Sequence, residues 1–130
     1  MPAATLSIPP LTEHVRTVRL VAVAAARRAG LAEDVVDDVR LAVGEVVARA
    51  VLLHGSLGSE RDVDVVIRDD GHDFTVEVTG EPGPAAGDTS DTDSDTDTAV
   101  ALALVHALVP AVGVEGGTVA LAWPLASASD

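Results

Sequence analysis

Asp37–Leu53, with the sequence DDVRLAVGEVVARAVLL, is the stretch that decides the fold. Its apolar residues recur three and four positions apart, which predicts one helix with a single buried stripe. The stripe consists of Val39, Val43, Val46, Ala50 and Leu53. At about 100° per residue, Asp38, Glu45 and Arg49 fall on a neighbouring edge of the helix. Glu45 and Arg49 are four positions apart, in the order that favours an exposed ion pair worth about 0.2–0.5 kcal/mol.

The segment before this helix predicts a strand and a first helix. Leu6–Ile8 fits a short edge strand that ends at the two prolines after it. Thr12 is the expected N-cap of a helix that continues to Ala29, and Gly30 follows as its C-cap residue. The apolar face of this helix consists of Val15, Val18, Ala22 and Ala25. The long helix is then expected to open at Ala32-Glu33-Asp34 and to end at His54-Gly55.

The second half of the chain predicts two hairpins and a third helix around an acidic segment. Asp62–Arg68 and Asp73–Thr79 alternate apolar and polar residues around a tight turn, which is typical of a hairpin. Ala99–Val109 predicts a helix that is apolar on nearly every side and therefore well buried. A last hairpin is expected from Ala111–Glu115 and Gly117–Trp123. The order predicts an α+β two-layer sandwich of one domain, residues 1–130, with helices on one face of a mixed, mostly antiparallel sheet.

Residues 80–98 differ sharply in composition from the rest of the chain. They contain the run DTSDTDSDTDT, which cannot bury apolar surface and repels itself, so we expect a flexible acidic loop. Its aspartates alternate as calcium ligands do, but the central glycine and distant glutamate of an EF-hand loop are missing, which favours a solvated linker. The four histidines have no metal-ligand spacing and are interpreted as surface or internally satisfied residues. The sequence therefore predicts no metal site.

The charge distribution excludes several classes of function. The formal net charge is −13, and residues 1–68 carry nine acids against eight arginines, whereas residues 69–130 carry twelve acids and no basic residue. Direct nucleic-acid binding is disfavoured, because neutralising phosphates requires clustered Lys or Arg. The chain has no cysteine, no apolar run long enough for a membrane span, and no signal-peptide pattern at its N-terminus. We therefore expect a cytoplasmic protein.

The sequence resembles the ATP-binding domain of the anti-sigma-factor serine kinases, in the GHKL ATPase superfamily with the Bergerat fold. Residues 13–45, EHVRTVRLVAVAAARRAGLAEDVVDDVRLAVGE, are similar to the first two helices of that family. Residues 101–125, ALALVHALVPAVGVEGGTVALAWPL, look like its last helix and closing hairpin. The resemblance implies the Bergerat sandwich, with residues 80–98 at the position of the ATP lid.

The functional motifs of that family are altered in this chain. The resemblance implies that Glu45 occupies the general-base position and that Arg49 replaces an Asn that binds Mg²⁺. A guanidinium has only donors, and its charge about 4 Å from the metal would cost several kcal/mol at an effective dielectric near about 20. An adenine-binding Asp is replaced at Gly80, and although Gly83 can keep the following turn, Glu81 is offset. Thr98 opens the third helix, without the phosphate-binding glycines expected there.

These departures predict a protein that has lost ordinary Mg·ATP chemistry, with no cofactor and Glu45 vestigial. The resemblance implies a regulator of a bacterial partner-switching pathway that binds a sigma factor or a STAS-type anti-anti-sigma protein. The residues implied at that contact are Glu13, Arg16 and Arg19 on the first helix.

Three alternatives remain open. The first is an active serine kinase that uses ATP or ADP with Mg²⁺ to phosphorylate a STAS-domain partner. The second is nucleotide binding without phosphate transfer, in which Arg49 acts as a fixed cation in place of the metal. The third is a homodimeric scaffold.

Overall fold

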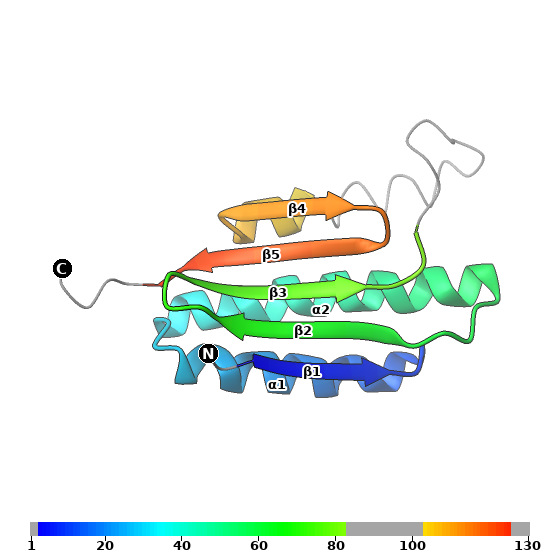
Figure 1. The fold of residues 1–130 in the computed structure, drawn as a ribbon, viewed down its shortest axis with the longest axis horizontal. Helices are drawn as coiled ribbons and strands as arrows, with labels where there is room; N and C mark the ends of the chain where they lie inside the picture. The colour runs from blue at the N-terminus through cyan, green and yellow to red at the C-terminus, as the bar shows by residue number, and fades with distance from the viewer. Residues whose placement is uncertain (1–2, 83–102, 126–130) are drawn as a thin grey trace.

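The structure, a computed structural model, describes residues 3–82 and 103–125 (Figure 1). Its elements in chain order are β1 (Ala3–Ile8), the 3-10 turn η1 (Thr12–His14), α1 (Val15–Arg28), α2 (Glu33–Leu57), β2 (Val63–Asp69), β3 (Asp73–Thr79), β4 (Ala111–Glu115) and β5 (Thr118–Pro124). Residues 103–108 form a further stretch of helix between β3 and β4.

The five strands form one sheet in the order β1-β2-β3-β5-β4, and each neighbouring pair is antiparallel. The helices lie on a single face of this sheet, with α1 behind β1, α2 behind β2 and β3, and residues 103–108 behind β4 (Figure 1). The predicted α+β two-layer sandwich is confirmed. The sheet is more regular than the predicted mixed sheet, because all pairings of the described strands are antiparallel.

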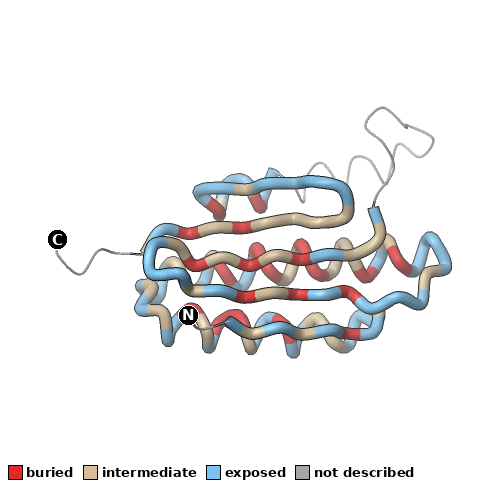
Figure 2. Tube along the Cα trace, viewed as in Figure 1, coloured by how far each residue is buried: buried red, intermediate tan, exposed pale blue. Residues whose placement is uncertain are grey.

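The core lies between the sheet and the helices (Figure 2). On β2 and β3 alternate residues point at the helices and are buried: Val63, Val65, Ile67, Phe74, Val76 and Val78. Phe74 and Trp123 face each other from neighbouring strands, with ring centroids 6.2 Å apart. The Trp123 indole Nε1 donates to the Leu108 carbonyl at 3.2 Å, which ties the helical stretch 103–108 to β5. The two aromatic residues of the chain therefore close one end of the core.

Helix α2 buries a broader stripe than the sequence predicts. Val39, Val43 and Val46 are buried as expected, whereas Ala50 and Leu53 are only partly buried. Val36, Ala42, Val47, Val51 and His54 are buried in addition. The stripe is wide because α2 packs on the sheet below it and on α1 beside it, so that more than one side of the helix is covered.

The predicted ends of both helices need correction. Thr12 is not an N-cap, because it lies inside η1, where Leu11 is the extended capping residue and no side chain caps the turn. Helix α2 does not stop at His54-Gly55 but continues one more turn to Leu57. Gly58 ends it with φ +67°, and the Ser59 amide donates to the His54 carbonyl at 2.9 Å. This left-handed ending needs a glycine, and Gly58 provides it instead of Gly55.

Other sequence-based boundaries differ less. β1 begins at Ala3, three residues before the predicted edge strand, and the two hairpins have the predicted turns, with φ +88° at Gly71 and +59° at Gly116. For the predicted helix Ala99–Val109, residues 99–102 lie outside the described part of the chain. The prediction that this helix is well buried is wrong for residues 103–108, because it touches the sheet with one stripe through Val105 while Leu104 remains 42% exposed.

Gly117 allows β5 to begin directly against the end of β3. The Gly80 amide donates to the Gly117 carbonyl at 2.9 Å, and a Cβ on Gly117 would lie 2.1 Å from the Gly80 carbonyl oxygen. We therefore expect Gly117→Ala to lower the free energy of unfolding by about 1–3 kcal/mol, measured by urea unfolding with Trp123 fluorescence. Gly113→Ala on β4 is the matched control, because a Cβ there meets no atom within 4 Å. Equal stability of the two variants would contradict this contact.

Candidate functional site

Arg19 of α1 crosses onto α2 at Gly44. Its Cδ atom lies 2.7 Å from the point where a Cβ on Gly44 would be, so the small residue makes room for the aliphatic part of the arginine. Glu13 and Arg16 lie on the same amino-terminal part of the helical layer and are exposed, as Arg19 is. The structure therefore brings these three predicted partner-binding residues together on η1 and the first turns of α1.

Glu45 and Arg49 lie on a different flank of α2. Both are partly buried, and Arg49 is about 140° around the helix axis from Gly44, away from α1. The ion pairs within residues 3–82 and 103–125 are Arg27–Glu33, Arg40–Asp37, Arg61–Glu81 and Arg68–Glu77. The predicted Glu45–Arg49 helix pair is therefore not formed between these two side chains. Gly83 and Thr98, the other predicted nucleotide-site residues, lie outside the described residues.

The ring of His54, on α2, packs against the end of β3, where the resemblance implies an adenine-binding Asp. Its ring is fully buried, and its two nitrogens contact two different segments. Nδ1 lies 2.9 Å from the Arg61 carbonyl oxygen, and Nε2 accepts the Glu81 amide at 2.8 Å. A Cβ on Gly80 would lie 2.8 Å from the same Nε2 atom. His54 therefore fills the space that a side chain at position 80 would need.

The Glu81 carboxylate points at the α2–β2 connection. It accepts hydrogen bonds from the Ser59 hydroxyl at 3.2 Å and from Arg61 Nη1 at 3.0 Å. The Glu81 side chain and the His54 ring therefore contact the same α2–β2 connection, the ring through the Arg61 carbonyl. A carboxylate committed to these two donors is a poor substitute for the missing Asp.

The importance of His54 was not recognised from the sequence. We interpreted the histidines as surface or internally satisfied, and the hydrogen bonds of His54 confirm the second of these for this residue. One signal was present: His54 follows Ala50 by four residues, on the buried stripe of the long helix. The signal was missed because the helix was expected to end there.

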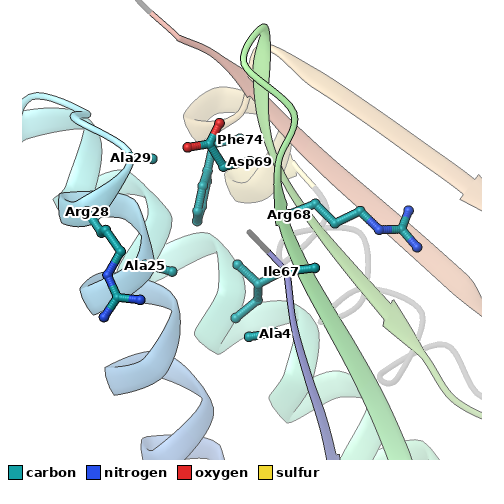
Figure 3. Close-up of a pocket in the computed structure, with 9 residues that line it drawn as sticks. Ala4, Ala25, Arg28, Ala29, Ile67, Arg68, Asp69 and Phe74 are labelled. Atoms are coloured by element: carbon teal, nitrogen blue, oxygen red, sulfur yellow. The ribbon is translucent and has the colours of Figure 1, made fainter. Parts of the chain in front are cut away.

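The structure also contains a small cavity at the opposite end of the strands (Figure 3). It has a volume of about 150 Å³ and is lined chiefly by Ala4, Ala25, Ala29, Ile67 and Phe74. The Arg68 side chain points away from it on the far side of β2 (Figure 3). Ligand pockets for molecules of nucleotide size usually have volumes of about 300–1,000 Å³, so this alanine-lined cavity is too small for a nucleotide.

The shifted pKa values of the described residues belong to turns remote from the contacts of His54 with Arg61 and Glu81. The side-chain hydrogen bond from Arg27 lowers the pKa of Glu33 where α1 meets α2. Backbone amides of Asp73 and His72 lower the pKa of Asp70 in the β2–β3 turn. These carboxylates stabilise the chain reversals, and they do not mark a catalytic site.

The comparison with protein families matches residues 8–123 to the histidine kinase-like ATPase domain. The chain belongs to this family. The match includes α1, α2 and all strands except the first five residues of β1 and the last residue of β5, so the family relation extends over both layers of the fold.

A solved structure agrees on the fold. The crystal structure of the RsbU and RsbW domains of Rv1364c from Mycobacterium tuberculosis superposes with a TM-score of 0.72 at 19% sequence identity. The similarity covers 96% of this chain and 33% of that one, so this chain spans about a third of its length. A search of curated proteins finds no match.

Two described residues bear on the nucleotide and the metal that the family name implies. His54 fills the space beside Gly80, and Arg49, at the position where the resemblance implies an Asn that binds Mg²⁺, has only hydrogen-bond donors. Within residues 3–82 and 103–125, no three His, Asp or Glu side chains gather closely enough to hold a metal ion.

The packing of His54 on Gly80 predicts a strong coupling between the two positions. Gly80→Asp alone is expected to lower the free energy of unfolding by about 1–3 kcal/mol, because the new side chain overlaps the imidazole. His54→Ala alone is expected to cost a similar amount, because the Glu81 amide loses its buried acceptor. In the double variant, the loss of unfolding free energy should be smaller than the sum of the two single losses, by about 1 kcal/mol or more. The measurement is urea unfolding followed by Trp123 fluorescence. Simple additivity would contradict direct packing of the two residues.

Proposed function

We propose that this protein is a regulatory binding module of a bacterial partner-switching pathway, a cytoplasmic relative of the anti-sigma kinases without ordinary Mg·ATP chemistry. The observation that carries the proposal is the packing of His54 against Gly80, because it removes the space for a base-recognising carboxylate. Among the helices of the described residues, none is long and apolar enough to cross a membrane.

Binding by occupancy requires an exposed surface that suits a protein partner. We define the α1–α2 face as Arg16 and Arg19 of α1 with Leu41 and Leu52 of α2. Leu41 is 53% and Leu52 64% exposed, and they lie one turn before and about two turns after Gly44, where the Arg19 side chain crosses. Exposed leucines bordered by arginines favour a partner that presents apolar and acidic side chains. We propose a sigma factor or a STAS-type protein as this partner, with Glu13 at the edge of the contact.

Calorimetric titration with ATP and ADP tests the loss of nucleotide chemistry. We expect no heat of binding at millimolar nucleotide, with or without Mg²⁺, in a sample whose folding is checked by Trp123 fluorescence. Binding in the micromolar range that depends on Mg²⁺ would overturn the proposal and support the active kinase, which transfer of phosphate to a STAS-domain serine would then establish. Binding that ignores Mg²⁺ but is lost in Arg49→Ala would support the fixed-cation alternative.

Substitution of Arg19 tests the binding surface. Arg19→Ala is expected to weaken binding of a purified sigma factor or STAS-domain protein about 5- to 30-fold, because its side chain lies at the centre of the α1–α2 face. Arg68→Ala is the matched control, because Arg68 is paired with Glu77 on the far face of the sheet. The measurement is surface plasmon resonance with each candidate partner immobilised. An equal loss of affinity in both variants would indicate a general charge effect instead of a local contact.

A second copy of the chain is a further candidate partner, and the open edge of the sheet favours it. Among the described strands, β1 pairs with β2 alone, and its sequence AATLSI contains none of the charged or proline residues that usually protect an edge. A shallow groove of about 300 Å³ follows this edge, lined by Ala4, Val21, Ala24 and other α1 residues. Leu20, which is 59% exposed, lines the same groove.

The outer stripe of α1 is complementary to itself. The stripe begins in η1 and continues along α1, with an acid at one end and a base at the other. Its residues follow one another at helical spacing: Glu13, Thr17, Leu20, Ala24 and Arg28. In a two-fold dimer, placing Leu20 of one copy over Val21 of the other puts Glu13 opposite Arg28 of the partner. This arrangement would join the two β1 edges as well.

Analytical ultracentrifugation tests the homodimer. We expect a concentration-dependent dimer that is lost in Leu20→Glu and retained in Leu57→Glu, which changes a similarly exposed leucine at the far end of α2. Glu13→Arg alone should weaken the dimer, and the addition of Arg28→Glu should restore it. A monomer at about 100 μM in the unaltered protein would contradict this assembly.

A further inference from the structure

His54 is the one buried polar or charged residue among residues 3–82 and 103–125. It lies in the last turns of α2 and joins this helix to the connection that follows it and to the end of β3, which is 27 residues away at Glu81. Nδ1 is 2.9 Å from the Arg61 carbonyl just before β2, and Nε2 is 2.8 Å from the Glu81 amide just after β3. Within the described residues, no buried side-chain nitrogen or oxygen atom lacks a hydrogen-bond partner.

These two bonds define the protonation state of the ring. The Arg61 carbonyl can only accept, so Nδ1 carries the proton. The Glu81 amide can only donate, so Nε2 must be unprotonated. The junction therefore requires the neutral imidazole with the proton on Nδ1. A second proton would place an N–H on Nε2 directly against the Glu81 N–H.

The charged groups around the ring do not replace this requirement. Arg61 and Glu81 pair with each other at 3.0 Å, and Glu81 also accepts from the Ser59 hydroxyl. Glu60 and Asp62 flank Arg61 in the sequence, Arg49 is on another side of α2, and Glu115 ends β4 next to the turn that contains Gly117. Unperturbed carboxylates and arginines keep their charge between about pH 5.5 and 7.5, whereas histidine changes charge within that range.

We propose that His54 is a pH-sensitive latch that holds the end of β3 on α2. While the ring is neutral, Nε2 accepts the Glu81 amide and the junction is closed. As the pH falls, protonation of Nε2 removes the acceptor, and Gly80 and Glu81 separate from α2 while the rest of the sheet stays folded. The opening is local because Glu81 lies just beyond the last β3 residue, outside the strand ladder.

This latch goes beyond the proposed function. It connects the helix that carries Glu45 and Arg49 to the end of β3, so acidification would alter the geometry of the candidate site without any ligand. The test needs no partner and no nucleotide, and its outcome is therefore independent of the binding function proposed above.

The test is amide hydrogen exchange followed by NMR on the ¹⁵N-labelled full chain between pH 5 and 7.5. We expect the protection factor of the Glu81 amide to fall as the pH is lowered, by at most about tenfold per pH unit, because opening takes up one proton. The protection factors of Val43 and Val76 in the core should change much less. His54→Gln should remove the pH dependence at Glu81, and His72→Gln, which changes an exposed turn histidine, should retain it.

Two results would overturn the latch. One is a Glu81 protection factor that does not respond to pH, and the other is an equal fall at Glu81, Val43 and Val76, which would mean global unfolding. If His54→Gln does not fold, the ring of the unaltered protein decides. Its ¹⁵N shifts should show the Nδ1–H tautomer at pH 7.5, where the Glu81 amide is protected. A folded ring with the proton on Nε2 would refute the proposal.

Discussion

The site depends on a single buried imidazole that accepts one backbone amide and donates to one backbone carbonyl. His54 holds the end of α2, the start of β2 and the end of β3 within one hydrogen-bonded cluster. Such a cluster is strong because each buried polar atom has a partner and because the surrounding packing excludes water. This cluster imposes two requirements: position 80 must have no side chain, and the histidine must remain neutral.

This arrangement gives a physical reason for the glycine at position 80, where the resemblance implies an Asp. A carboxylate side chain at position 80 and the buried His54 ring exclude each other, because both cannot occupy the same space. The Glu81 carboxylate, one residue further on, is used by Ser59 and Arg61. One fold can carry different functional sites, so the shared family fold alone does not define the activity of this chain.

The two helices divide the remaining surface between them. Arg19 lies across Gly44 on the α1 side of α2, whereas Glu45 and Arg49 lie on the opposite flank. The residues implied in partner contact and those implied in chemistry are therefore separate surfaces of the same helical layer. This separation allows docking on α1 to be retained after the chemistry of the other flank has changed, and it makes the proposed binding module compatible with the family fold.

Periodicity in the sequence was sufficient for the architecture. The spacing of Val39, Val43 and Val46 and the alternation in β2 and β3 defined the helix and the hairpin, because a buried face imposes its own period on the chain. Local patterns could not decide the helix ends. Gly55 and Gly58 can both adopt the left-handed conformation, and the one that does so, Gly58, is the one that follows the last packed turn. The burial of residues 103–108 was overestimated for a similar reason, because composition does not reveal how much of a helix touches the sheet.

The candidate site shows the same division. The sequence by itself determined that position 49 is an arginine, that position 80 is a glycine and that an acidic run follows, and the resemblance implies that Asn and Asp are replaced at the first two positions. Only the tertiary structure decided why position 80 is a glycine, because the imidazole that fills its space comes from a residue 26 positions earlier on α2. Contacts between residues so far apart depend on how the helix is placed over the sheet, and that placement follows from packing of the whole core and not from any local stretch.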